Sequence, residues 1–129
     1  MAKRLISKQI KIDAFVASPA KRAKKTAELF AKEYGLPAEE IIFIPSLYHA
    51  APPTFYEVVA QLPDKFDTVA MFSHNPGITE FVNTLTSGIR IDNMPTCSVF
   101  AVKIKTQSWD SMEKADKEFW FFDYPKGEL

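Results

Sequence analysis

The chain has 129 residues, 47% hydrophobic and 25% charged, and its sixteen basic side chains balance sixteen acidic ones. This composition is typical of a globular domain. The zero net charge gives no general attraction to nucleic acids or acidic membranes, so we expect neither as a partner. No apolar run approaches the roughly 18 residues that span a bilayer. A single cysteine, Cys97, excludes an internal disulfide and suits a reducing compartment, so we expect a cytoplasmic protein.

The first part of the chain predicts helices and strands in alternation. Residues 2–9 read as a short amphipathic helix, and residues 12–17 as a strand with almost no polar alternation. A continuous apolar strand is typical of a parallel sheet, where both faces are buried. A long amphipathic helix follows over residues 19–34, and Gly35 stands where a helix C-terminus favours glycine. Residues 41–45 predict a second apolar strand.

The second part continues this alternation and then changes. Residues 54–62 predict a short helix, residues 68–73 a third buried strand and residues 76–86 another helix. Residues 98–105 alternate and residues 118–124 are strongly aromatic, which predicts an antiparallel pair near a sheet edge. Together the elements predict one α/β domain over the whole chain, a three-layer sandwich with a mostly parallel central sheet.

Two junctions share one pattern, in which an apolar strand ends in a small polar residue, a proline follows and a helix begins. The polar residue is Ser18 in the first junction and Asn75 in the second. Both residue types favour helix N-caps, and proline suits the first helical position. Each junction would direct the free N–H groups of a helix toward a strand end, where anions bind. Because Arg22 and His74 lie beside these junctions, the pattern predicts a phosphate site.

Each candidate residue also has a purely structural interpretation. Arg22 could be a solvent charge on a polar helix face, although its planar guanidinium matches phosphate bidentately. His74 could cap a backbone group, and Ser18 suits an N-cap better than a nucleophile because no Gly-x-Ser-x-Gly elbow surrounds it. His49 is a rim residue, a substrate contact or neither, and Glu57 is the nearest carboxylate for a proton donor. The histidines and the cysteine lack ligand-like spacing, so we expect no metal.

Three segments resemble the histidine phosphatase superfamily. Residues 16–28, Val-Ala-Ser-Pro-Ala-Lys-Arg-Ala-Lys-Lys-Thr-Ala-Glu, are similar to its SPxxRAxxTAE segment. Residues 72–77, Phe-Ser-His-Asn-Pro-Gly, are similar to its GHNPG segment in the form of the SixA-type phosphohistidine phosphatases, and residues 47–50 resemble the LYxA segment of that branch. The segments follow the family's order and spacing, and the similarity spans residues 2 to about 125.

The resemblance implies a phosphoglycerate mutase-like fold and a phosphatase reaction without metal or other cofactor. In the family a histidine attacks phosphorus and water hydrolyses the phosphohistidine, while two arginines and a second histidine hold the phosphoryl oxygens. Arg22 matches the second arginine and His74 the second histidine. Ser18 and Asn75 join them as implied substrate-binding residues, and Glu57 is the candidate acid. The implied substrate carries a phosphomonoester or is a phosphohistidine protein.

The chain departs from the family at the first motif. Arg-His-Gly or Arg-His-Ala, which carries the nucleophilic histidine and the first arginine, is absent, so we expect the chain as written to be inactive or nearly so. The missing strand should leave unpaired edges on the strands ending at Ser18 and His74. Three explanations fit: an enzyme shortened at its N-terminus, which is the simplest; a strand from another chain, in a homo-oligomer formed through the exposed sheet edge; or a non-catalytic phosphoryl-binding or protein-interaction module.

Overall fold

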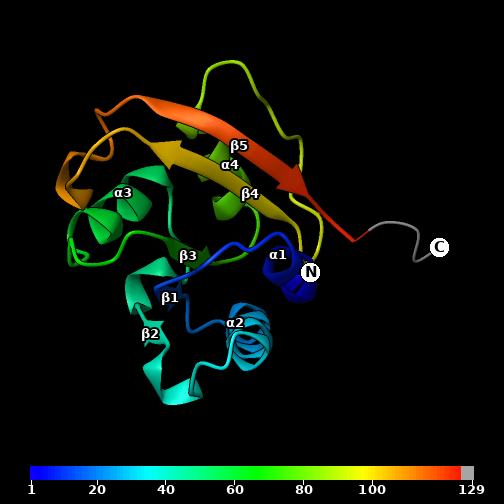
Figure 1. Ribbon diagram of the computed structural model, residues 1–129. Coiled ribbons are helices and arrows are strands. Elements are labelled where there is room, and N and C mark those ends of the chain that lie inside the picture. Colours follow the sequence, from blue (N-terminus) through cyan, green and yellow to red (C-terminus); the bar gives the residue numbers. More distant parts are fainter. Residues whose placement is uncertain (126–129) are drawn as a thin grey trace. The chain divides into compact units, whose positions relative to one another are not determined.

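The computed structural model describes residues 1–125 (Figure 1). These residues form two compact units. The first unit contains residues 1–49 and 65–74, and the second contains residues 50–64 and those from 75 onward. The chain therefore passes between the units three times, and neither unit is one continuous stretch of sequence. Within the described part of the chain, every helix is too short or too polar to cross a lipid bilayer.

A parallel three-stranded sheet with the order β2-β1-β3 forms the centre of the first unit. The central strand β1 (Ala14–Ala17) pairs with β2 (Ile42–Phe43) on one side and with β3 (Val69–Phe72) on the other. All four residues of β1 are buried, as the unbroken apolar run predicts. The prediction of a parallel sheet is confirmed.

Of the two unpaired strand edges that the sequence predicts, the one on the strand before His74 is present and the one on the strand before Ser18 is not. β1 has a hydrogen-bonded neighbour on both sides, so the strand that ends before Ser18 has no unpaired edge. In the described part of the chain, β3 is an edge strand, and its residues are half-buried instead of buried. The prediction of a fully buried third strand was wrong, because an edge strand has a neighbour on only one side and keeps more contact with solvent.

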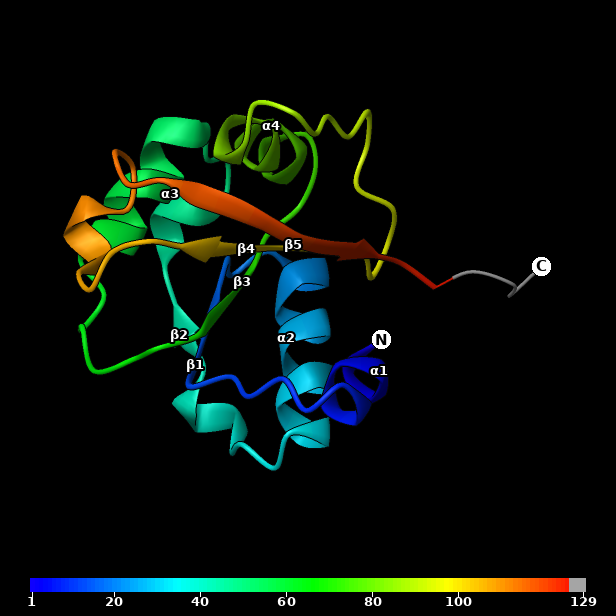
Figure 2. The same ribbon diagram turned by 45° about the horizontal axis from the view of Figure 1, so that its top comes forward.

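Two helices accompany this sheet in the first unit. α2 (Lys21–Glu33) packs on it through aromatic rings: Phe30 meets the ring of Phe72 edge-on at 5.3 Å, and Phe72 stacks on Phe15 at 5.7 Å. α1 (Ala2–Ser7) packs against α2 (Figure 2). These contacts bury the apolar stripe of α2, which accounts for the amphipathic pattern of its sequence.

The first strand–proline–helix junction differs from its prediction. α2 begins at Lys21 with Ala20 as its N-cap, so Pro19 lies before the helix. Ser18 does not cap the helix either, because its Oγ accepts a hydrogen bond of 3.1 Å from the N–H of Ala20 in the turn before it. Such local bonds compete with helix formation, which explains the later start. At the other end Gly35 has a φ of 73°, confirming the predicted glycine after the helix.

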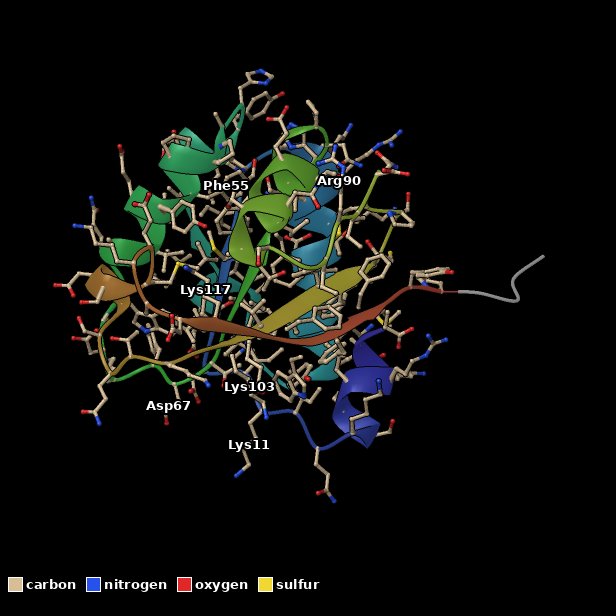
Figure 3. All side chains as sticks on the ribbon, turned by 90° about the horizontal axis from the view of Figure 1, so that it is seen from above. Lys11, Phe55, Asp67, Arg90, Lys103 and Lys117 are labelled. Atoms are coloured by element: carbon tan, nitrogen blue, oxygen red, sulfur yellow. The ribbon has the colours of Figure 1, made fainter. Side chains whose placement is uncertain are left out.

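The second unit contains an antiparallel pair, β4 (Val99–Ile104) and β5 (Lys117–Asp123), as the alternating and aromatic segments predict. The two strands hydrogen-bond to each other in a separate two-stranded sheet. On this pair, which carries Lys103 in Figure 3, the ammonium of Lys103 lies 4.9 Å from the centre of the Trp120 ring. A cation over an exposed indole stabilises such a surface modestly.

Two helices of the second unit pack through a trio of rings. In α3 (Pro52–Ala60), the ring of Phe55 stacks on Phe81 of α4 (Gly77–Leu85), with 4.6 Å between ring centres. Tyr56 meets Phe81 edge-on at 5.2 Å. These rings form the contact that holds α3 and α4 together. The remaining described helices are three short 3₁₀ turns, η1 (Ala38–Glu40), η2 (Pro45–Leu47) and η3 (Trp109–Ser111).

The second junction also differs from its prediction. α4 begins at Gly77 with Pro76 as its N-cap, so the proline is not the first helical residue. Asn75 does not cap the helix through its side chain. Its Oδ1 accepts a hydrogen bond from the hydroxyl of Thr79, and its Nδ2 donates to the carbonyl of Met94 at 3.0 Å. The amide is thus occupied by tertiary partners, and these compete with the capping bond.

Gly77 is required by a close approach of two backbone segments. A Cβ atom at this position would overlap the carbonyl oxygen of Ala50 and would lie 3.6 Å from the ring of Phe55. The segment before α3 therefore touches the first residue of α4. Any side chain at position 77 would push these segments apart.

Candidate functional site

The carboxyl ends of the three parallel strands lie at one edge of the first unit. The N–H of Ser18, directly after β1, donates to the carbonyl of Phe72 at the end of β3, at 2.9 Å. The N–H of Ile44, directly after β2, donates to the carbonyl of Ala17 at the end of β1, also at 2.9 Å. In open α/β sheets, ligands bind outside this edge. The first unit therefore places the segments after all three strands where a ligand is expected.

Ser18 shapes the turn that leads from β1 into α2. The residue is completely buried, and its hydroxyl oxygen accepts the hydrogen bond from the N–H of Ala20. This bond holds the start of the helix in place, since a buried hydroxyl needs a partner. The observed contact of Ser18 is thus within the turn that leads to the helix of Arg22. Direct contact of Ser18 with substrate stays a prediction.

Arg22 is the second residue of α2, and its side chain is exposed. Among the described residues it has no carboxylate partner. Lys21 and Lys25 on the same helix are exposed as well, so position alone does not distinguish the arginine. The planar fork of N–H donors distinguishes the arginine from the lysines, because it matches two oxygens of one phosphoryl group. An unpaired guanidinium one turn from a strand end is available to an external anion.

His74 lies two residues beyond the end of β3 and is half-buried. Its Nδ1 atom is buried and has no hydrogen-bond partner among residues 1–125. A buried nitrogen without a partner is destabilising by about 1–3 kcal/mol, so such atoms are exceptions that need an explanation. No group among residues 1–125 provides one.

Two further rings from the segment after β2 lie against His74. The ring centres of Tyr48 and His49 lie 5.8 Å and 6.2 Å, respectively, from that of His74, and 4.5 Å from each other. We call Tyr48, His49 and His74 the ring cluster. Both Tyr48 and His49 are exposed. The cluster therefore presents two imidazoles at the edge where the parallel strands end.

Two of the predicted site residues belong to the second unit. Asn75 uses both ends of its amide within that unit, on Thr79 and Met94, as described above. Glu57 is an exposed residue of α3. Their roles in substrate binding and proton donation stay predictions. In residues 1–125, no three His, Cys, Asp or Glu side chains gather closely enough to hold a metal ion.

Comparison with known proteins identifies the fold. No family model and no curated protein matches this chain. A solved structure assigned as phosphohistidine phosphatase SixA from Nakamurella multipartitia aligns with a TM-score of 0.77 and 18% identity, covering 98% of this chain and 78% of that one. Another, the protein histidine phosphatase SixA complexed with tungstate, aligns with a TM-score of 0.75 and 20% identity, covering 94% of this chain and 74% of that one. The chain has the SixA fold.

This result confirms the fold class and the SixA-type likeness that the motifs predict. At identities this low, the likeness establishes the fold and leaves the activity to the residues of the site. The sequence proposes Arg22 and His74 as site residues, and these assignments stay predictions; it does not include Tyr48 and leaves His49 undecided. The only signal for both was the Leu-Tyr-His-Ala segment, because neither residue lies in a strand or a helix.

Proposed function

We propose that this chain binds phosphoryl groups as a member of the histidine phosphatase superfamily, with a phosphohistidine protein or a phosphomonoester as its substrate class. Two observations together carry the proposal. Arg22 has an exposed guanidinium without a carboxylate partner, and the buried Nδ1 of His74 has no hydrogen-bond partner among the described residues. Both follow adjacent, hydrogen-bonded strands of one sheet, β1 and β3. The SixA structure solved with tungstate adds support, because tungstate is a tetrahedral oxyanion like phosphate.

The chemistry of the two groups is complementary. The guanidinium offers two parallel N–H donors to the phosphoryl oxygens, and the imidazole offers one more from the end of the neighbouring strand. Such donors would also stabilise charge that shifts onto these oxygens during hydrolysis. Asn75 and Glu57 enter the proposal as a further substrate contact and a proton donor. With its single cysteine, the protein suits the cytoplasm.

Turnover requires a nucleophile, and neither histidine of this sequence follows an arginine as the family motif demands. We therefore expect binding without appreciable hydrolysis by the chain as written. The second candidate function, a non-catalytic phosphoryl-binding or interaction module, is favoured by the same observation. The phosphatase and the non-catalytic module differ in whether a longer or assembled form of this chain supplies the nucleophile.

Thermal unfolding in millimolar phosphate or tungstate tests the binding site. Ligand at about 100 times its dissociation constant stabilises a folded protein by about 2.7 kcal/mol, so the melting temperature should rise by several degrees. Arg22→Ala should abolish the rise. Lys25→Ala, which removes another exposed cation from the same helix, is the matched control and should keep it. No rise in the original chain, or an equal rise in Arg22→Ala, would contradict the proposal.

A chromogenic phosphomonoester tests turnover. We expect no hydrolysis above the buffer rate, because the site has donors for the phosphoryl oxygens but no family nucleophile. Hydrolysis that disappears in His74→Ala would show that the chain is a complete enzyme and would refute the expected inactivity.

A further inference from the structure

We propose that His49 is a second imidazole ligand of the bound phosphoryl group and that it donates to the same oxygen as His74. This inference rests on the proposed function, since it adds a residue to that site. The chain turns toward the ring cluster after β2. There η2 ends at Leu47, which is completely buried, and the next two residues turn outward into the ring cluster. The buried leucine anchors a short segment that carries His49 toward the end of β3.

The separation of the two imidazoles suits a shared acceptor. Their ring centres lie 6.2 Å apart, and their planes are inclined by 80°. Because an N–H···O bond spans about 2.9 Å, two imidazoles that donate to one oxygen have ring centres roughly 6 Å apart. The rings are too far apart and too steeply inclined to stack on each other. The observed separation of the ring centres therefore matches that of two imidazoles that donate to one oxygen.

Tyr48 holds this arrangement from a third side. Its ring meets His49 edge-on at 79° and His74 at 73°. Edge-to-face contacts of this kind favour a fixed relative orientation of the rings. The two imidazoles are thus kept near each other although His49 itself is exposed.

The chemistry of the pair points to an anion. Among residues 1–125, neither imidazole has a hydrogen bond or an ion pair with a carboxylate. Two positively charged imidazolium rings at this distance would repel each other unless a negative charge lay between them. A phosphoryl oxygen supplies that charge, and it accepts from both nitrogens at once. Because His49 is exposed, its packing contributes little to stability. Contact with a ligand therefore accounts better for its position.

Nuclear magnetic resonance of the imidazole nitrogens tests this directly, because the chain contains only two histidines. Inorganic phosphate is added to ¹⁵N-labelled protein, and the side-chain signals of both histidines are followed. We expect both to shift with one common dissociation constant. His49→Phe keeps a ring beside Tyr48 but removes the donor, and it should weaken phosphate binding about tenfold or more. Ser46→Ala, an exposed change in the same segment, should leave the affinity unchanged.

The outcomes separate the two proposals. If phosphate binds and shifts only the His74 signals, or if His49→Phe binds as tightly as the original chain, His49 is not a ligand and the proposed function stands without it. If phosphate shifts neither histidine and does not raise the melting temperature, both proposals fail together. A common shift with weakened binding in His49→Phe and unchanged binding in Ser46→Ala supports the shared oxygen.

Discussion

Gly77→Ala tests whether residue 77 must be glycine because the backbone before α3 approaches it too closely for a side chain. The added methyl group would overlap the carbonyl oxygen of Ala50 and approach the ring of Phe55 to 3.6 Å. Neither neighbour can swing aside, because one is backbone and the other is a completely buried ring stacked on Phe81 at 4.6 Å. Overpacking of this kind is destabilising by about 1–3 kcal/mol. Replacing glycine by alanine in a helix regains about 0.5–1 kcal/mol, so we expect a net loss of up to about 2.5 kcal/mol.

Urea unfolding followed by circular dichroism measures this loss, provided that the slope of the transition is unchanged. Gly88→Ala is the matched control, because a Cβ at Gly88 has no neighbour within 4 Å. That variant should be as stable as the original chain or up to about 1 kcal/mol more stable. Equal urea midpoints for the two variants would refute the steric argument. In that case the overlap would not account for the glycine.

Two further substitutions test contacts within the first unit. Asp13→Ala removes a carboxylate oxygen that accepts from the N–H groups of the two residues just before β3, at 2.8 Å and 3.0 Å. This should lower the free energy of unfolding by about 1 kcal/mol, and an unchanged urea midpoint would contradict the expectation. Burial raises the pKa of Tyr34, whose hydroxyl donates to the carbonyl of Ile10 at 2.8 Å. The unfolded chain therefore loses this proton first, and stability should fall as the pH rises above about 10. Tyr34→Phe should lose less stability than the original chain between pH 9 and pH 11, and an equal loss would contradict the assignment.

The sheet and its main helix could be predicted because their sequences are unambiguous. Four consecutive buried residues in β1 appear as an uninterrupted apolar run, and the repeat of small and aromatic residues marks the buried face of α2. The helix starts could not be predicted. The side chains of Ser18 and Asn75 are good caps by residue type, but they bond to a preceding turn and to a distant loop instead. Such competition depends on tertiary neighbours.

The positions of the candidate site residues were foreseeable only in part. Arg22 and His74 stand out because they follow strand ends in motifs of known order. The half-buried β3 was not foreseen, since strand order decides which strand is at an edge and the apolar run of Val69–Phe72 resembles that of a central strand. The contact of His49 with His74 crosses the end of β1, between segments that are not adjacent in sequence. No local pattern encodes such a contact.

The interleaving of the two units has a consequence for biosynthesis. β1 completes its pairing only with β3, and the bond that joins Asp13 to Thr68 closes a span of 55 residues. That span includes α3, which belongs to the other unit and packs there on α4, a helix that emerges from the ribosome after β3. Pairing over such distances in sequence makes folding slower, because the entropy of closing the loop is lost before the contacts form. Neither unit can fold completely until residues that follow part of the other unit have been synthesised. A single cleavage of the chain therefore cannot separate either unit intact.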